Sequence, residues 1–216
     1  MTEQVQPIHQ ARAGIYEMLA LAYAQPTPDR LARVQGLSSR LEGHDIADHF
    51  DLASPAASFA AAAATSAAHE LERDYEDLFV HSTGSRPRET AFLEPDADAK
   101  PVLDSVLACY SAFGLDPGRS GVNPPDFVGS ELQFMGILAN RRTACAERAD
   151  TQDGAYRAAE EGFMREHLGR WVKAFAQRVE LEAGTFFYRS LAGLTAAFTA
   201  ADARFLGVKP GAGRFS

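Results

Sequence analysis

Hydrophobic residues recur every three or four positions along most of the chain, which is the period of a helix with one buried face. No segment shows the sustained alternation of apolar and polar residues that is typical of a strand. The pattern therefore predicts an all-α fold of about seven helices, in one globular domain over residues 1–206 followed by a flexible tail at 207–216. The apolar stripes are clearest in residues 9–24, 31–41, 101–113, 126–148, 164–179 and 187–198.

The middle of the chain is less regular. Ser54 and Pro55 are a typical helix start, and the alanine-rich run that follows predicts a long helix extending to about Val80. Residues 81–99 have no period and contain two prolines, a glycine and several charges, which predicts an irregular connector. Connectors this long in compact domains are often functional, but a surface linker or a hinge between two helical halves fits the composition equally well.

A proline-rich turn precedes the helix expected at 126–148. Pro124 and Pro125 cannot donate backbone hydrogen bonds, so an earlier helix must end before them. Asp126 then lies where the next helix begins, and its carboxylate is suited to cap the first turn. An ordinary turn that leads into an ordinary core helix explains this pattern too, so we give Asp126 a capping and a ligand-binding role with equal weight.

Composition and charge narrow the functional classes. Hydrophobic residues make up 46% of the chain, and no apolar run approaches the roughly 20 residues needed to span a bilayer. The first residues lack the pattern of an export signal, so we expect a cytoplasmic protein without stable membrane insertion. A net charge of −8 argues against nucleic acid as a partner. Cys109 and Cys145 are too far apart in sequence for a CxxC motif and are expected to be small buried hydrophobes.

Signals of catalysis or metal binding are weak. The sequence contains no HExxH motif, no GxSxG motif and no glycine-rich phosphate loop. Glu166 and His167 are adjacent, so on a helix they point to different faces and are poorly placed to bind one metal ion. His81 is a possible ligand or base, although a histidine at a helix C-terminus more often complements the helix dipole. We therefore expect a protein that is not an enzyme and that holds no cofactor or metal.

Several short motifs occur in a recognisable order and together resemble the TorD/DmsD family of molybdoenzyme-specific chaperones. The resemblance covers roughly residues 70–200. The motifs are Tyr75-x-x-Leu78-Phe79, Pro87-x-Glu89-Thr90, Pro125-Asp126-x-x-x-x-Glu131-Leu132-x-Phe134-Met135-x-x-Leu138, Phe163-x-x-x-His167-Leu168-x-x-Trp171 and Phe187-Tyr188-x-x-Leu191-Ala192-x-Leu194-Thr195.

The resemblance implies a cytoplasmic chaperone that binds the twin-arginine signal peptide, the apo form of a molybdopterin-containing oxidoreductase, or both. Such a chaperone assists cofactor insertion and delays export until the enzyme is mature. One departure matters: Phe127 stands where the family usually has histidine, and a phenyl ring cannot exchange a proton as imidazole does. Any role of that histidine is therefore not transferred to this chain.

The resemblance also suggests which residues bind the peptide. A twin-arginine signal presents two guanidinium groups before an apolar segment, so we expect an apolar trough with carboxylates at one end. For each apolar residue named below, a position in the hydrophobic core is the alternative to peptide binding. The predicted contacts are Tyr75, Leu78, Phe79, Pro125 and Phe134 for the trough and Asp126 and Glu131, or Asp77, for the arginines.

Two alternatives stay open at this point. The first is a helical cofactor- or nucleotide-binding protein that acts in molybdoenzyme maturation. The second concerns assembly: a homodimer that exchanges helices across residues 81–99 is compatible with the length of that connector.

Overall fold

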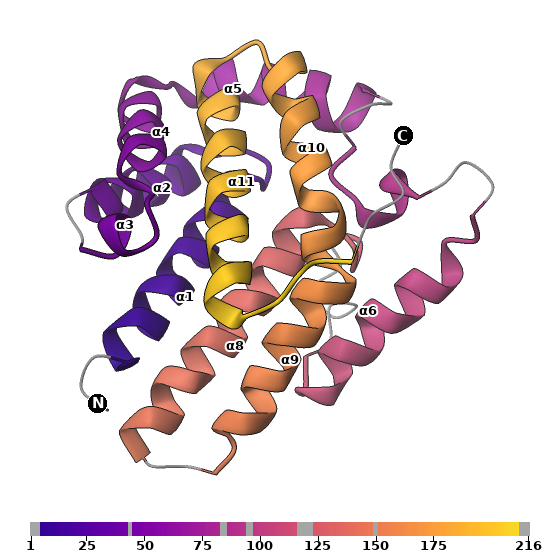
Figure 1. Cartoon of the computed structure of the whole chain (residues 1–216). Coiled ribbons are helices and arrows are strands. Elements are labelled where there is room, and N and C mark those ends of the chain that lie inside the picture. The colour runs from indigo at the N-terminus through magenta and orange to yellow at the C-terminus, as the bar shows by residue number, and fades with distance from the viewer. Residues whose placement is uncertain are drawn as a thin grey trace.

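The computed structural model describes residues 5–42, 45–82, 86–93, 97–115, 123–148 and 151–211, and it confirms the all-α fold class (Figure 1). None of the described helices is both long enough and apolar enough to cross a bilayer. The elements are α1 (Val5–Ala22), α2 (Pro28–Glu42), α3 (Asp45–His49), α4 (Ala53–Thr65), α5 (Ala68–Tyr75), the π-helical segment η1 (Glu76–His81), the 3-10 segment η2 (Glu89–Phe92), α6 (Lys100–Ala112), α8 (Val128–Arg148), α9 (Asp153–Glu166), α10 (Leu168–Glu182) and α11 (Phe186–Leu206).

The helices pack in pairs around one core. α1 packs along α8, α9 packs against α8, and α10 runs beside α11, while α2, α3 and α4 gather on one side of the molecule and α6 lies on the other (Figure 1). Gly136 allows the close approach of α1 and α8, because a Cβ atom there would lie 3.0 Å from the Cβ of Tyr16. The core between these pairs is rich in aromatic rings, and Trp171, Phe175 and Phe198 are completely buried.

The predicted number of helices was wrong: the described residues contain ten α-helices rather than seven. The long alanine-rich helix breaks after Thr65, and Ser66 and Ala67 have extended backbones. The hydroxyl groups of Thr65 and Ser66 donate to backbone carbonyls three or four residues earlier. Such bonds offer the backbone an alternative to helical pairing, and alanine contributes too little buried surface to hold the helix together across the break.

His167 causes the second split. Its backbone angles, φ −124° and ψ −98°, interrupt the stripe expected at 164–179 and separate α9 from α10. Met164 and Leu168 are nevertheless both fully buried, because the two helices present their apolar faces to the same core. Periodicity alone therefore predicted the buried face correctly and missed the change of direction. The short helix α3 lies in a region for which the sequence predicted no element.

The connector expected at 81–99 is anchored at its centre. Glu89 and Phe92, the two ends of η2, are only 3% and 4% exposed. Residues 83–85 and 94–96 lie outside the described residues, and helix exchange across this connector stays a prediction. In the segment expected as a tail, Val208 is buried and the Gly211 backbone N–H donates to the Arg165 carbonyl at 3.0 Å, so its first residues pack on the helical body. Residues 212–216 lie outside the described residues.

Candidate functional site

The connector is joined by hydrogen bonds to the turn that precedes α8. The Glu89 N–H donates to the Asp126 carbonyl at 2.9 Å, and the Val128 N–H donates to the Pro87 carbonyl at 2.8 Å. Arg88 and Phe127 form an antiparallel β-bridge between these bonds. Two motifs that are almost forty residues apart in the sequence are thereby brought into contact.

Asp126 is the centre of this contact. Its buried carboxylate accepts from the Thr90 hydroxyl at 2.6 Å, from the Thr90 backbone N–H at 3.2 Å and from Arg88 Nε at 3.1 Å. The capping role given to Asp126 was wrong, because these donors come from the connector and not from the first turn of α8. The Arg88 side chain is 40% exposed while Asp126 is completely buried, so a guanidinium group covers this carboxylate from the solvent side.

A histidine and a second acid continue the contact toward α10. His167 Nδ1 lies 3.0 Å from Glu89 Oε2, and His167 Nε2 lies 2.9 Å from Ser105 Oγ. Burial alone would lower the pKa of His167, but hydrogen bonding with Cys109 and Glu89 outweighs burial and raises it to about 9. The imidazole is therefore protonated near neutral pH. Although the order of these groups resembles a serine hydrolase triad, an imidazolium cannot accept the Ser105 proton, so the arrangement serves structure.

Glu131, the third acid, lies inside the core. Its Oε2 atom accepts from the indole N–H of Trp171 at 3.0 Å. Burial and the neighbouring charge of Glu89 hold the pKa of Glu131 well above its usual range. Within the described ranges, no group of three or more His, Cys, Asp or Glu side chains is placed to hold a metal ion. We call the whole set the connector network: Arg88, Glu89, Thr90, Ser105, Asp126, Glu131, His167 and Trp171.

The predicted apolar contacts next to this network belong largely to the core. Phe134 is 2% exposed, and its ring centroid lies 4.8 Å from those of Tyr110 and Phe163. Pro125 is half-buried, and its carbonyl accepts from the Tyr110 hydroxyl at 2.8 Å. These residues support the Pro-Pro turn from beneath.

The other predicted residues lie around η1. Leu78 and Phe79 are 2% and 8% exposed, and Tyr75 is half-buried with its ring 5.2 Å from that of Phe79. Phe79 reaches the connector indirectly, since it contacts Phe175, which in turn contacts Phe92 of η2. The seven predicted residues thus form two groups joined through η2 and α10 rather than one open trough. Their role in binding a peptide stays a prediction.

A second buried polar cluster was missed by the sequence analysis. Arg12 donates to both carboxylate oxygens of Asp202, at 2.5 and 2.9 Å, and its Nη2 atom lies 2.9 Å from Glu160. Arg142 pairs with Glu160 at 2.9 Å and with Asp153 at 2.8 Å. We call these five residues the arginine network. It ties α1, α8, α9 and α11 together.

The sequence did contain a signal for the arginine network. Arg12 precedes Tyr16 by four residues, and Asp202 follows Phe198 by four, so both charges lie on apolar helical faces. A charge on a buried face requires a buried partner of opposite sign. Arg88 was missed for a different reason: it is the unspecified residue within the motif Pro87-x-Glu89-Thr90.

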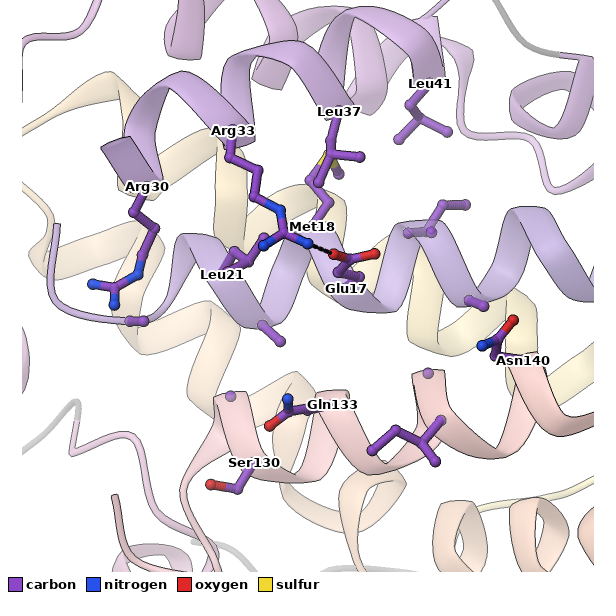
Figure 2. Close-up of a pocket in the computed structure, with 18 of the residues that line it drawn as sticks. Glu17, Met18, Leu21, Arg30, Arg33, Leu37, Leu41, Ser130, Gln133 and Asn140 are labelled. Atoms are coloured by element: carbon purple, nitrogen blue, oxygen red, sulfur yellow. Dashed lines mark hydrogen bonds and ion pairs between the residues drawn. The ribbon is translucent and has the colours of Figure 1, made fainter. Parts of the chain in front are cut away.

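A groove with a volume of about 820 Å³ lies between α1, α2 and α8 (Figure 2). None of the seven predicted site residues lines it, but Phe127, the residue that replaces the family's histidine, does. Phe127 is 4% exposed, and its ring would lie 2.6 Å from a Cβ atom on Gly129. Glycine is therefore required at 129 for this ring position.

Comparisons with known proteins agree on the type of molecule. The sequence profile of the family described as nitrate reductase delta subunit matches residues 46–177, which is more than half of the chain. Chaperone protein TorD of Photobacterium profundum is 28% identical over 63% of this chain and 64% of its own length. A perchlorate reductase assembly chaperone of Dechloromonas aromatica is 30% identical over 41% of this chain and 39% of its own length.

Two further matches cover nearly the whole chain. Chaperone protein TorD of Vibrio vulnificus is 24% identical over 95% of this chain and 99% of that protein. The crystal structure of a protein of Archaeoglobus fulgidus, described as a redox enzyme maturation protein, has the same fold, with a TM-score of 0.53. The two proteins are 18% identical, and the match covers 90% of this chain and 93% of that one. These matches confirm the resemblance deduced from the motifs, and the curated relatives are named as chaperones rather than enzymes.

Proposed function

Because the chain belongs to the nitrate reductase delta subunit family, we propose that it is a cytoplasmic assembly chaperone for a molybdopterin-containing oxidoreductase. In this role it binds the twin-arginine signal peptide of the apoenzyme, assists cofactor insertion and delays export until the enzyme is complete. The matches to the first two relatives span 64% and 39% of their lengths. The first relative is named chaperone protein TorD, and the second is named for the assembly of perchlorate reductase.

The observation that carries the proposal is the arrangement at Asp126. A completely buried carboxylate is covered by the half-exposed guanidinium of Arg88. A guanidinium from a signal peptide has the same charge and the same donor geometry, so it is able to replace Arg88 on Asp126 without leaving a buried charge unpaired. Binding at this position therefore exchanges one arginine for another.

The apolar part of the signal peptide needs an adjacent surface, and we assign it to η1. Tyr75 is half-buried and Val80 is 59% exposed, while Leu78 and Phe79 form the layer beneath them. π-helical segments are rare and are often associated with functional sites. Because Phe175 contacts both Phe79 of η1 and Trp171 of the connector network, a peptide on η1 lies on the same packed unit as Asp126.

The test is a calorimetric titration of the protein with a twin-arginine signal peptide from a candidate client and with the same peptide carrying alanine at both arginines. We expect a Kd in the micromolar range or tighter, and a value at least about tenfold weaker for the alanine peptide. Asp126→Asn keeps an acceptor for Thr90 but removes the charge, so it should weaken arginine-peptide binding by a similar factor with little change in melting temperature.

Two results would contradict the proposal. One is equal affinity for the arginine and alanine peptides. The other is weaker binding by Asp126→Asn that is accompanied by unfolding of the variant. Thermal unfolding of the same samples would reveal this loss of folded protein. Binding of a nucleotide or cofactor in place of any signal peptide would favour the alternative of a cofactor-handling protein.

A further inference from the structure

The groove between α1, α2 and α8 has the form of a trough whose floor is α1 and whose walls are α2 and α8 (Figure 2). It contains no residue of the connector network. Residues from both walls follow one another along its length. In order from one end they are Arg30, Arg33, Leu37 and Leu41 on α2 and Ser130, Gln133 and Asn140 on α8.

The floor contains a glycine that the fold does not require. Gly14 lies in the interior of α1, and a Cβ atom placed on it would meet no other atom within 4 Å. Glycine inside a helix costs roughly 0.5–1 kcal/mol relative to alanine. Close packing explains Gly136, where a Cβ atom would press on Tyr16, but it does not explain Gly14. The space above Gly14 is therefore open to a side chain of another molecule.

The charge on the α2 wall is opposite to that of the protein as a whole. The chain carries 29 acidic and 21 basic residues, yet the groove is lined by Arg30, Arg33 and Arg40 and by a single acid, Glu17. Arg33 pairs with Glu17 across the groove, and the two side chains are 62% and 47% exposed. Exposed pairs contribute only about 0–1 kcal/mol, so an acidic residue from a partner replaces Glu17 at little cost.

The remaining residues that line the groove would contact the other sides of a ligand. Gln133 and Asn140 on α8 present side-chain amides, which both donate and accept hydrogen bonds. Apolar residues of the floor helix α1, among them Met18 and Leu21, lie between the two walls, and Leu37 and Ile137 add apolar surface on the walls themselves. The lining thus combines a basic border, an apolar strip and a neutral polar border.

We propose that this groove binds an amphipathic helix of a partner protein, with acidic residues along the border that faces α2. The stretch of α2 from Arg30 to Leu41 rises by about 16 Å, which corresponds to a partner helix of roughly 12 residues. Apolar residues at positions i, i+3, i+4 and i+7 of that helix would contact the strip. A twin-arginine segment carries the opposite charge and is excluded from this groove, so the proposal does not depend on the proposed function.

The probes are three fluorescein-labelled 15-residue peptides with the same leucine stripe, whose flanking positions carry glutamate, lysine or glutamine. Fluorescence anisotropy with the intact protein should give an affinity for the glutamate peptide at least about tenfold above that for the lysine peptide. The preference should shrink between 50 and 300 mM salt, because the arginines are partly exposed. Equal affinity for the glutamate and lysine peptides overturns the proposal.

A matched pair of variants places the peptide in the groove. Gly14→Leu fills the space on the floor and should weaken binding of the glutamate peptide at least tenfold. Gly36→Leu makes the same change at an exposed position of α2 that does not line the groove. A Cβ atom on Gly36 also meets no atom within 4 Å, so this variant should leave binding unchanged. If Gly14→Leu does not fold, the variant Arg33→Gln/Arg40→Gln, at two exposed arginines of the groove, tests the same point. Retained binding by this variant overturns the proposal.

Two competing occupants give different results. A second copy of this chain would produce a dimer in sedimentation equilibrium that Gly14→Leu abolishes and Gly36→Leu retains. A small anion as the natural occupant would let millimolar inorganic phosphate displace the glutamate peptide completely. Either result replaces the helix as the occupant.

Discussion

The arginine network and the connector network are both buried and polar, but they differ in how their acids are neutralised. In the arginine network Asp202, Glu160 and Asp153 each pair with Arg12 or Arg142, and both arginines are largely buried. In the connector network the cations are an imidazolium and the half-exposed Arg88, and the hydrogen-bond donor to Glu131 is the neutral Trp171 indole. Both cations of the first network are buried, whereas one cation of the second, Arg88, is 40% exposed.

The acids of the two networks reflect this difference. Burial raises the pKa of Glu160, but Arg12 and Arg142 oppose the rise. At Glu131 burial and the charge of Glu89 act in the same direction, so the pKa rises well above its usual range. Removal of a cation is therefore expected to damage the arginine network, while the connector network is suited to exchange Arg88 for another cation.

The largest effect is expected from breaking the arginine network. Arg12→Met leaves Asp202 and Glu160 buried beside an apolar side chain, and removing one partner of a buried pair typically costs about 3–5 kcal/mol. Urea unfolding followed by circular dichroism measures this loss. Arg33→Met removes an exposed arginine and should cost less than about 1 kcal/mol. Equal losses in the two variants would show that Arg12 is not a central structural residue.

A smaller effect comes from pH, and it has opposite signs in the two networks. The pKa of His167 is raised to about 9, so its contribution to stability is complete below pH 6.5 and is lost as the pH rises to 9, by an amount on the order of 2 kcal/mol. His9 adjoins the arginine network, with its Nδ1 atom 3.1 Å from Arg12 Nη1. Burial, Arg142 and Arg12 lower the pKa of His9 to about 4, so stability is lost there as the pH falls from 6.5 to 4.

Unfolding midpoints between pH 4 and pH 9 test this difference. The wild-type protein should lose stability between pH 6.5 and pH 9. His167→Gln should reduce the decline on the alkaline side without removing it, because the raised pKa of Glu131 acts in the same direction. A decline between pH 6.5 and 9 that His167→Gln leaves unchanged would refute the assignment of a charged imidazole.

The smallest stability effect is expected at the hydrogen bond that holds the connector. Thr90→Val removes the hydroxyl that donates to Asp126 at 2.6 Å and should cost about 1–2 kcal/mol. Hydrogen exchange should quicken at the Glu89 and Val128 amides, which bridge the connector and the turn. Thr65→Val, at the exposed end of α4, is the matched control and should leave those two amides unchanged.

Local spacing predicted the features that depend on neighbours in the sequence. Apolar faces were placed correctly, and Thr27, which directly precedes α2, caps it by accepting from the Arg30 N–H at 3.2 Å. The capping alternative for Asp126 was wrong because Thr90, thirty-six residues earlier, donates to its carboxylate. Such competition between distant donors leaves no trace in helical periodicity.

The pairing of distant charges was also beyond the sequence. Arg12 and Asp202 are 190 residues apart, and each was recognisable only as a charge on an apolar face. The motif residues were found through the family resemblance, which gave their identity but not their geometry. Phe134, expected in the trough or in the core, is almost fully buried, and Glu131, expected as a contact for the arginines, is fully buried.

The most direct test of the account is a calorimetric titration of Arg88→Gln with the twin-arginine peptide and its alanine control. Exchange at Asp126 requires the peptide arginine to displace Arg88. The half-exposed Arg88–Asp126 pair is worth roughly 1 kcal/mol, so its absence in Arg88→Gln should tighten binding of the arginine peptide about fivefold. The alanine peptide should be unaffected, as should the control variant Arg86→Gln at the neighbouring exposed arginine. Weaker binding of the arginine peptide to Arg88→Gln, or no change, would contradict the role of Asp126 as the position where the signal arginine binds.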